Sequence, residues 1–389
     1  MLNLFSDDNR RNPFPLYDQV RAAMPVLPVP EADAWMLFDY DSVKRVILDQ
    51  ETFSSSMQTA GRKNPDWLIF HDPPRHSKLR ALIAQAFTPR SIANLEQRIR
   101  EISRGLLDRH LSSGAMDWVA DFAVPLPLLV ITEMLGAPVE DQPRYRKWSD
   151  VILRLSYTIS QNEETAIAVA EYYNVSTEMG AYVAELVEDR RRTPTDDLLT
   201  RLVEAEVDGE HLTQRELLGF FQLLIVAGHE TTTNLLANTL ICLLDNPGEF
   251  ARLRAKPDLL TAAVEEVLRY RSPVQFVFRA TRREVELNGQ RIPKGKLLMP
   301  VIGAANRDPK YFPDPHRFQI DREPNPHIAF GHGIHFCLGA ALSRLEARVA
   351  LTDFFGRTNN LRLASDAPWQ PRPALHVHGP QSLPVRFDA

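Results

Sequence analysis

Cysteine is scarce in this chain of 389 residues, which holds only Cys242 and Cys337. Two cysteines so far apart in sequence exclude a disulfide framework and are typical of a reducing compartment. They also exclude an iron–sulfur cluster of the four-cysteine type.

Long uninterrupted apolar runs are missing as well. The longest apolar stretch, 217–244, carries His229, Glu230 and several threonines and asparagines at its centre. A lipid-spanning helix would not concentrate polar groups there without a surrounding bundle. The N-terminus, MLNLFSDD, lacks the basic and apolar regions of a signal peptide. We therefore expect a buried helix in a soluble protein, with no membrane anchor and a cytoplasmic location.

The chain also lacks a charge excess, internal repeats and Gly/Ser-rich linkers. Its 45 basic and 50 acidic residues give a net charge of −5, which argues against nucleic acid as the main partner. The apolar content of 44% supports a substantial core. We expect a single domain over residues 1–389.

Helical periodicity dominates the pattern, so the predicted fold class is mainly α with a small β-rich region. An Asn-Gly pair at 288–289 predicts a hairpin turn. Helices are predicted over 41–49, 91–111, 140–156, 161–190, 213–244, 258–271 and 339–356, and strands over 34–38, 276–281, 297–301 and 384–387.

The most informative segment is 330–339, which reads FGHGIHFCLG. Its glycines allow a tight turn and the close approach of a flat ligand. Helical spacing from Leu338 onward puts Cys337 at a helix N-terminus, where the helix dipole favours a thiolate. Such a thiolate suits an axial ligand for haem iron. By itself the segment leaves two alternatives open: a small core hydrophobe, or a zinc site with His332 and His335.

A second polar segment, AGHETT at 227–232, lies in the middle of the predicted helix 213–244. Threonine hydroxyls can compete for backbone carbonyls, so a local opening of the helix is expected there. The acid Glu230 and the alcohol Thr231 could pass protons to bound oxygen. A zinc-protease interpretation fails, because Thr233 stands where a second histidine is needed.

Two further pairs are ambiguous without context. Glu266 and Arg269 share a helix face, like an ordinary surface ion pair. His76 and Arg80 follow a predicted helix start, and they could hold an anionic group or form a solvated basic face.

Together these segments resemble a bacterial cytochrome P450, a soluble haem-thiolate monooxygenase, from about residue 12 to the C-terminus. Segment 330–339 fits that family's F-G-x-G-x-H-x-C-x-G pattern. The resemblance implies the P450 fold, with haem b (iron protoporphyrin IX) between the long central helix and the helix after the cysteine loop.

The resemblance also implies roles for individual residues. Cys337 would be the axial ligand of the haem iron, and Glu230 and Thr231 the catalytic acid and alcohol. Glu266, Arg269 and Arg317 would form a buried ion network that fixes the loop presenting the cysteine. The remaining haem contacts would come from His76, Arg80, Ala227, Arg279, His335 and Gly339.

The resemblance implies a substrate pocket built from separate, mostly apolar segments, which predicts a hydrophobic small organic substrate. Positions around 155–180 would contribute, and Gln275 and His378 would be polar contacts. Core packing explains any single one of these residues equally well. The pocket residues would be Trp67, Leu68, Ile69, Leu223, Val226, Gln275, Val277 and Val377.

Besides O2, the enzyme would need electrons from a separate ferredoxin and ferredoxin reductase, since no flavin or iron–sulfur motif is present. Arg344 and Arg348, four residues apart, could dock such an acidic donor or form a solvated helix face. A peroxide-driven peroxygenase and a non-catalytic haem-binding protein are the alternatives. The acid–alcohol pair favours the oxygen-using enzyme.

Overall fold

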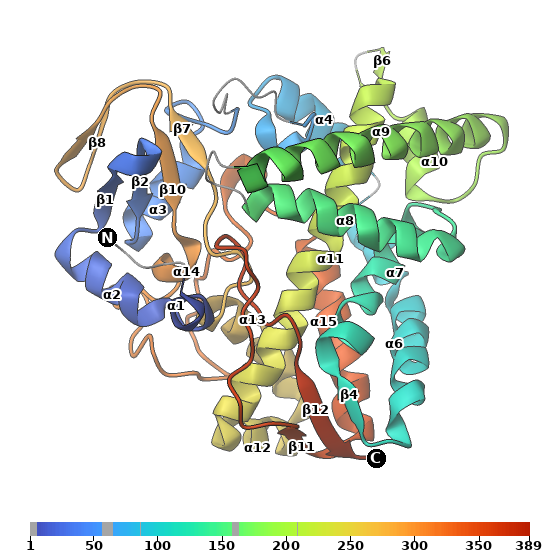
Figure 1. Ribbon diagram of the computed structural model, residues 1–389, viewed down its shortest axis with the longest axis vertical. Coiled ribbons are helices and arrows are strands. Elements are labelled where there is room, and N and C mark those ends of the chain that lie inside the picture. Colours follow the sequence, from blue (N-terminus) through green and yellow to red (C-terminus); the bar gives the residue numbers. More distant parts are fainter. Residues whose placement is uncertain (1–5, 57–64, 86, 158–162, 208) are drawn as a thin grey trace.

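The computed structural model describes residues 6–56, 65–85, 87–157, 163–207 and 209–389. Long helices form most of the molecule, and a smaller β-rich region lies beside the N-terminal helices (Figure 1). The α-helices are α1 (Asp7–Arg11), α2 (Phe14–Ala23), α3 (Tyr40–Leu48), α4 (Arg75–Ala84), α5 (Pro89–Ala93), α6 (Glu96–Leu111), α7 (Pro125–Met134), α8 (Gln142–Tyr157), α9 (Glu163–Arg192), α10 (Leu198–Glu204), α11 (Gln214–Asp245), α12 (Pro247–Ala255), α13 (Leu260–Tyr270), α14 (Ile302–Ala305) and α15 (Ala340–Arg357).

The strands form one mixed sheet, one small antiparallel sheet and two hairpins. The mixed sheet has the order β1-β2-β10-β7-β3, and β10 runs parallel to β2, with Met299 opposite Met36. Its strands are β1 (Val26–Val29), β2 (Ala34–Leu37), β3 (Phe53–Ser54), β7 (Arg279–Thr281) and β10 (Leu297–Pro300). The small sheet holds β4 (Ala115–Asp117), β11 (Asn359–Leu363) and β12 (Pro384–Asp388), and the hairpins are β5 (Glu206–Val207) with β6 (Glu210–His211) and β8 (Val285–Leu287) with β9 (Gln290–Ile292).

The predicted mainly-α fold class is confirmed, with local differences. The expected helix over 91–111 divides into α5 and α6, and the strand expected over 276–281 is confined to β7. The Asn-Gly turn joins β8 to β9, with φ of 46° at Asn288 and 74° at Gly289. Residues 158–162 of the proposed pocket stretch 155–180 lie outside the described residues, and 161–162 are also the first two residues of the predicted helix over 161–190.

Helix α11 crosses the middle of the molecule and packs against α7, α8, α9, α13 and α15 (Figure 1). A capping box between Thr213 and Glu216 starts it. It continues through 227–232 without interruption, so the predicted local opening was wrong. The Thr231 hydroxyl does donate to the Ala227 carbonyl oxygen at 3.0 Å, but this bond is compatible with a continuous helix.

Among the described residues, every helix is too short or too polar to span a membrane.

Candidate active site

The cysteine loop is a tight bend held by its own backbone. Gly331 and Gly333 have φ of 73° and 72°, a left-handed conformation that favours glycine. The Cys337 amide donates to the Phe330 carbonyl oxygen at 2.9 Å and closes the bend. Helix α15 begins three residues further on, with Gly339 as its N-cap, so the cysteine lies just before the helix rather than on its first turn.

The thiol of Cys337 is open to solvent on one side, whereas Cys242 is buried. Surrounding protein atoms raise the pKa of the Cys337 thiol, and the Gly339 amide, Arg80 and Arg344 oppose that increase. Burial raises the pKa of Cys242 to about 12, although the charges of Arg271 and Arg307 oppose the increase. Of the two cysteines, Cys337 therefore has the surroundings that a thiolate needs.

Basic side chains from separate elements converge beside this loop. The rings of His76 on α4 and His335 lie with their centroids 4.3 Å apart. His335 Nε2 lies 2.9 Å from the Ser55 hydroxyl oxygen. Arg80, one turn after His76, donates to the Phe336 carbonyl oxygen at 2.7 Å, next to the cysteine. Tertiary contacts thus connect the predicted cofactor residues of α4 with the cysteine loop.

Arg279 on β7 completes this cluster of basic residues, and its guanidinium donates to its neighbour's carbonyl oxygen at 2.8 Å. Burial, helped by Arg80, lowers the pKa of His76 to about 4, and burial, helped by Arg279, lowers the pKa of His335 to about 3. Burial also lowers the pKa of Arg279 to about 10. Burial is the largest cause of all three pKa shifts, so the cluster gathers basic side chains that are largely shielded from water.

His76 provides the test of whether this cluster fits haem b. Its side chain is 2% exposed, yet neither ring nitrogen has a hydrogen-bond partner among the described residues. Buried polar atoms are nearly always paired in native proteins, so an unpaired one indicates a missing partner. The carboxylates of a haem would supply acceptors for His76, Arg80, Arg279 and His335, and the residues therefore fit the group.

Glu230 and Thr231 lie side by side on α11, in the turn that begins at exposed Ala227. The Glu230 carboxylate is buried and accepts from Asn234 Nδ2 at 3.3 Å. It also forms an ion pair with Arg372, whose Nε lies 3.2 Å from Glu230 Oε1. The arrangement gives a buried acid and an alcohol in adjacent positions.

The neighbouring residues of this turn have structural roles. Gly228 lets α7 approach closely, because a Cβ there would lie 3.0 Å from Ile131 Cγ1. His229 Nδ1 lies 3.2 Å from the Ile225 carbonyl oxygen and 3.3 Å from the Ser149 hydroxyl. Burial lowers the pKa of His229, and its contacts are those of a core histidine.

The ion network around Glu266 differs from the predicted one in its third member. Glu266 and Arg269 are fully buried and joined by two bonds of 2.7 and 2.8 Å. Arg322, and not Arg317, supplies the third side chain, with its Nε 3.1 Å from Glu266 Oε1. Arg317 is exposed and contributes only its carbonyl oxygen, which accepts from Arg269 and Arg322. A second arginine in the same irregular segment was the sequence signal for this alternative.

The predicted substrate residues separate into groups. Trp67, Leu68, Leu223 and Val226 belong to one apolar cluster beside the central helix, where the Trp67 indole also donates to Gln222 at 3.1 Å. Ile69 is 43% exposed and does not belong to that cluster. Val277 packs instead against the core under the mixed sheet.

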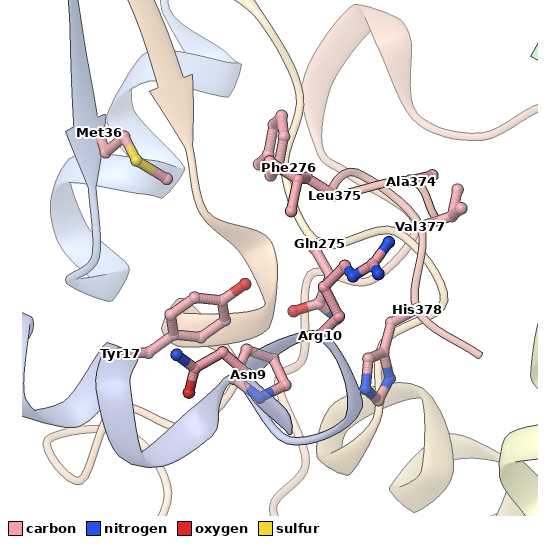
Figure 2. A pocket seen from close by; sticks show the side chains of 11 residues that line it. Asn9, Arg10, Tyr17, Met36, Gln275, Phe276, Ala374, Leu375, Val377 and His378 are labelled. Atoms are coloured by element: carbon pink, nitrogen blue, oxygen red, sulfur yellow. The ribbon is translucent and has the colours of Figure 1, made fainter. Parts of the chain in front are cut away.

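Gln275, Val377 and His378 line a different, small pocket, shared with Arg10 and Tyr17 of the N-terminal helices (Figure 2). The Gln275 amide donates to the Ser272 carbonyl oxygen at 2.7 Å, and His378 Nε2 lies 3.1 Å from the Arg11 carbonyl oxygen. The His378 contact belongs to the packing between the N-terminal helices and the C-terminal segment. Gln275 bonds within its own loop, and its buried Oε1 has no partner among the described residues. Contact of either side chain with substrate stays a prediction.

A zinc site at His332, His335 and Cys337 finds no support either. Across the described ranges, no three histidine, cysteine or acidic side chains come together in a group that could hold a metal ion. Arg372 and Asn234, which both contact Glu230, were not predicted. No local pattern marks Arg372, because its partner is distant in sequence. Asn234 lies one helical turn after Glu230, and that spacing was the signal that could have found it.

Comparison with known proteins agrees with the geometry. Residues 22–359 match the family model for Cytochrome P450. The chain is 40% identical over 390 residues to Cytochrome P450 109 of Bacillus spizizenii, covering 100% of this chain and 95% of that protein. It is 39% identical over 403 residues to the monooxygenase PikC of Streptomyces venezuelae, covering 99% and 94%.

A solved structure is similar over nearly the same extent. The structure of CYP109E1 from Bacillus megaterium in complex with testosterone has a TM-score of 0.93 and 38% identity, covering 99% of this chain and 100% of that one. Family model, relatives and solved structure all cover most of the chain and agree on one family. The chain belongs to the cytochrome P450 family.

Proposed function

We propose that Cys337 is the axial ligand of the haem b used by this cytochrome P450 monooxygenase, and that the basic cluster holds the haem carboxylates. Bound haem supplies the iron that activates O2, and its thiolate ligand favours cleavage of the O–O bond. The unpaired, buried nitrogens of His76 are the observation that carries this assignment, because none of the described residues is their hydrogen-bond partner. The difference spectrum of the reduced protein with carbon monoxide tests it, and a band typical of histidine ligation would contradict it.

Glu230 and Thr231 are proposed to handle protons for oxygen activation. The buried carboxylate takes protons from solvent, and the Thr231 hydroxyl, one residue away, holds the water or oxygen that receives them. Thr231→Ala should keep haem and ligand binding but divert electrons to hydrogen peroxide. An unchanged ratio of product to electrons consumed would remove Thr231 from this role.

The substrate is proposed to be an apolar molecule of the steroid or long-chain acyl class. The cluster of Trp67, Leu68, Leu223 and Val226 supplies an apolar wall beside α11. Among similar structures, CYP109E1 is bound to testosterone or corticosterone, and P450BioI to an acyl carrier protein carrying hexadec-9Z-enoic acid (TM-score 0.92, 33% identity). Titration with testosterone, corticosterone and hexadec-9Z-enoic acid should shift the haem spin state. A normal carbon monoxide spectrum with no shift from any of them would reject this class.

Electrons are proposed to come from a separate ferredoxin and its reductase in the cytoplasm. A peroxide-driven peroxygenase is the second candidate, but it would have no use for a buried acid one residue from an alcohol. Product formation with the redox chain, and none with hydrogen peroxide alone, is the expected result. The reverse result would favour the peroxygenase.

A further inference from the structure

The C-terminal segment 371–380 docks on one face of α11. Asn238 Nδ2 donates to the His378 carbonyl oxygen at 2.8 Å. Gly379 lies so close to Asn234 that an added Cβ would come within 2.2 Å of its Oδ1. Arg372 forms its ion pair with Glu230. Positions 230, 234 and 238 are four residues apart, so one stripe of the helix holds the whole segment.

The segment is closed on itself, which fixes Arg372 in place. The Arg372 amide donates to the Gly379 carbonyl oxygen at 3.0 Å, and Pro371 pairs with Pro380 in an isolated antiparallel bridge. The side chain of Arg372 is 16% exposed and that of Glu230 is 3% exposed. A cation held this way, beside a buried carboxylate, is an ordered partner and not a surface counter-ion.

Both contacts to Glu230 fall on the same oxygen. Asn234 Nδ2 lies 3.3 Å and Arg372 Nε 3.2 Å from Oε1. Neither contact occupies Oε2, which is therefore the oxygen left to carry a proton. The charge of Glu230 acts to raise the pKa of three nearby titratable groups: His376 of the same segment, Asp150 of α8 and His229 of α11 itself.

We propose that Arg372 is a positioning residue for proton delivery, so that the C-terminal segment is part of the oxygen-activating apparatus. This inference rests on the proposed role of Glu230. Arg372 and Asn234 anchor Oε1 and turn Oε2 toward the active site. When the Oε2–H bond breaks, the proton goes to the water or oxygen held by the Thr231 hydroxyl. Arg372 then stabilises the Glu230 carboxylate that remains, until a proton from solvent restores the acid.

The test uses the holoenzyme of Arg372→Gln, Arg372→Lys, Glu230→Gln and the double variant Arg372→Gln/Glu230→Gln. Asn238→Ala is the matched control, because it removes an anchor of the same segment two helical turns from the acid. Hydrogen peroxide released per dioxygen consumed would be measured in H2O and D2O, with ferredoxin, reductase and added testosterone. Unfolding midpoints of the same variants give a readout that is independent of turnover.

We expect Arg372→Gln to raise the peroxide share and the solvent isotope effect several-fold, Arg372→Lys to restore part of both, and Asn238→Ala to leave both unchanged. In the Glu230→Gln background the Arg372 substitution should add nothing to the peroxide share, and the changes in unfolding midpoint should be non-additive.

Equal effects of Arg372→Gln with and without Glu230, or an equal effect of Asn238→Ala, would overturn the inference. If Glu230→Gln raises the peroxide share but Arg372→Gln does not, only this inference fails. If Glu230→Gln itself has no effect, the proposed role of the acid fails first.

Discussion

The ion network around Arg269 and the basic cluster around His76 are both buried, but they differ in how many of their hydrogen-bonding groups have partners. In the ion network, the five N–H donors of Arg269 make five bonds, to Glu266 and to three carbonyl oxygens. In the basic cluster, His76 is almost equally buried but has no partner in the described ranges.

The difference separates a structural network from a binding site. A buried charge network that is complete within the chain stabilises one arrangement of the backbone, here the irregular segment that leads to Cys337. A buried cluster with donors to spare is costly until a ligand fills it. Burial alone therefore does not mark a site; the basic cluster is distinguished by unpaired buried nitrogens that lie beside the cysteine loop.

The largest expected effect is the loss of haem ligation when Cys337 itself is replaced. Cys337→Ser should abolish the strongly red-shifted band of the reduced, carbon monoxide-bound protein, because a serine hydroxyl cannot supply the thiolate. The matched control is Cys242→Ser, at a buried cysteine of α11, which should keep that band. A normal band in the Cys337 variant would refute the ligand assignment.

The next effect tests the complete network. Arg322→Ala should destabilise the protein by about 3–5 kcal/mol, because Glu266 loses a buried partner. Arg317→Ala removes an exposed side chain and should cost less than about 0.5 kcal/mol. Thermal and denaturant unfolding of both variants measures the difference. Equal costs would mean that the third member of the network has been wrongly identified.

A substitution in the incomplete cluster should have opposite effects on stability and on cofactor affinity. His76→Leu should leave the haem-free protein as stable as the parent or slightly more stable, since it removes unpaired buried nitrogens. The same variant should lose haem about tenfold more readily in transfer to a haem acceptor protein, because a hydrogen-bond donor is missing. If the haem-free variant is instead much less stable, His76 has a partner within the chain, and the contrast between the clusters disappears.

The smallest effect concerns Arg344 and Arg348 of α15, whose side chains are each about two-fifths exposed. Both are paired, with Glu265 and Glu96. Although burial opposes the shift, hydrogen bonds from Arg344 and His327 lower the pKa of Glu265 to about 2. Charge reversal of both arginines should slow reduction by ferredoxin a few-fold, and added salt should reduce the difference from the parent.

A control variant, Arg291→Glu, reverses an exposed arginine in the hairpin that β8 and β9 form. Its reduction rate should match the parent. Unchanged reduction in the double variant at Arg344 and Arg348 would exclude both arginines from the docking surface.

The sequence determined the elements whose signals are local. The Asn-Gly hairpin turn and the glycines of the cysteine loop each fix nearby backbone, and the structure has both where they were predicted. The capping box that starts α11 is equally local, since it joins residues three apart. Adjacent or one-turn pairs, such as Glu230 with Thr231 and Glu266 with Arg269, follow from helix geometry in the same way.

Tertiary structure alone decided which distant side chains share a partner. Three contacts follow no local pattern: Arg322 rather than Arg317 pairs with Glu266, His378 contacts the Arg11 carbonyl oxygen, and Arg372 pairs with Glu230. The physical reason is that helix and turn signals act over a few residues, whereas a buried charge takes whichever partner the packed chain brings within hydrogen-bonding distance.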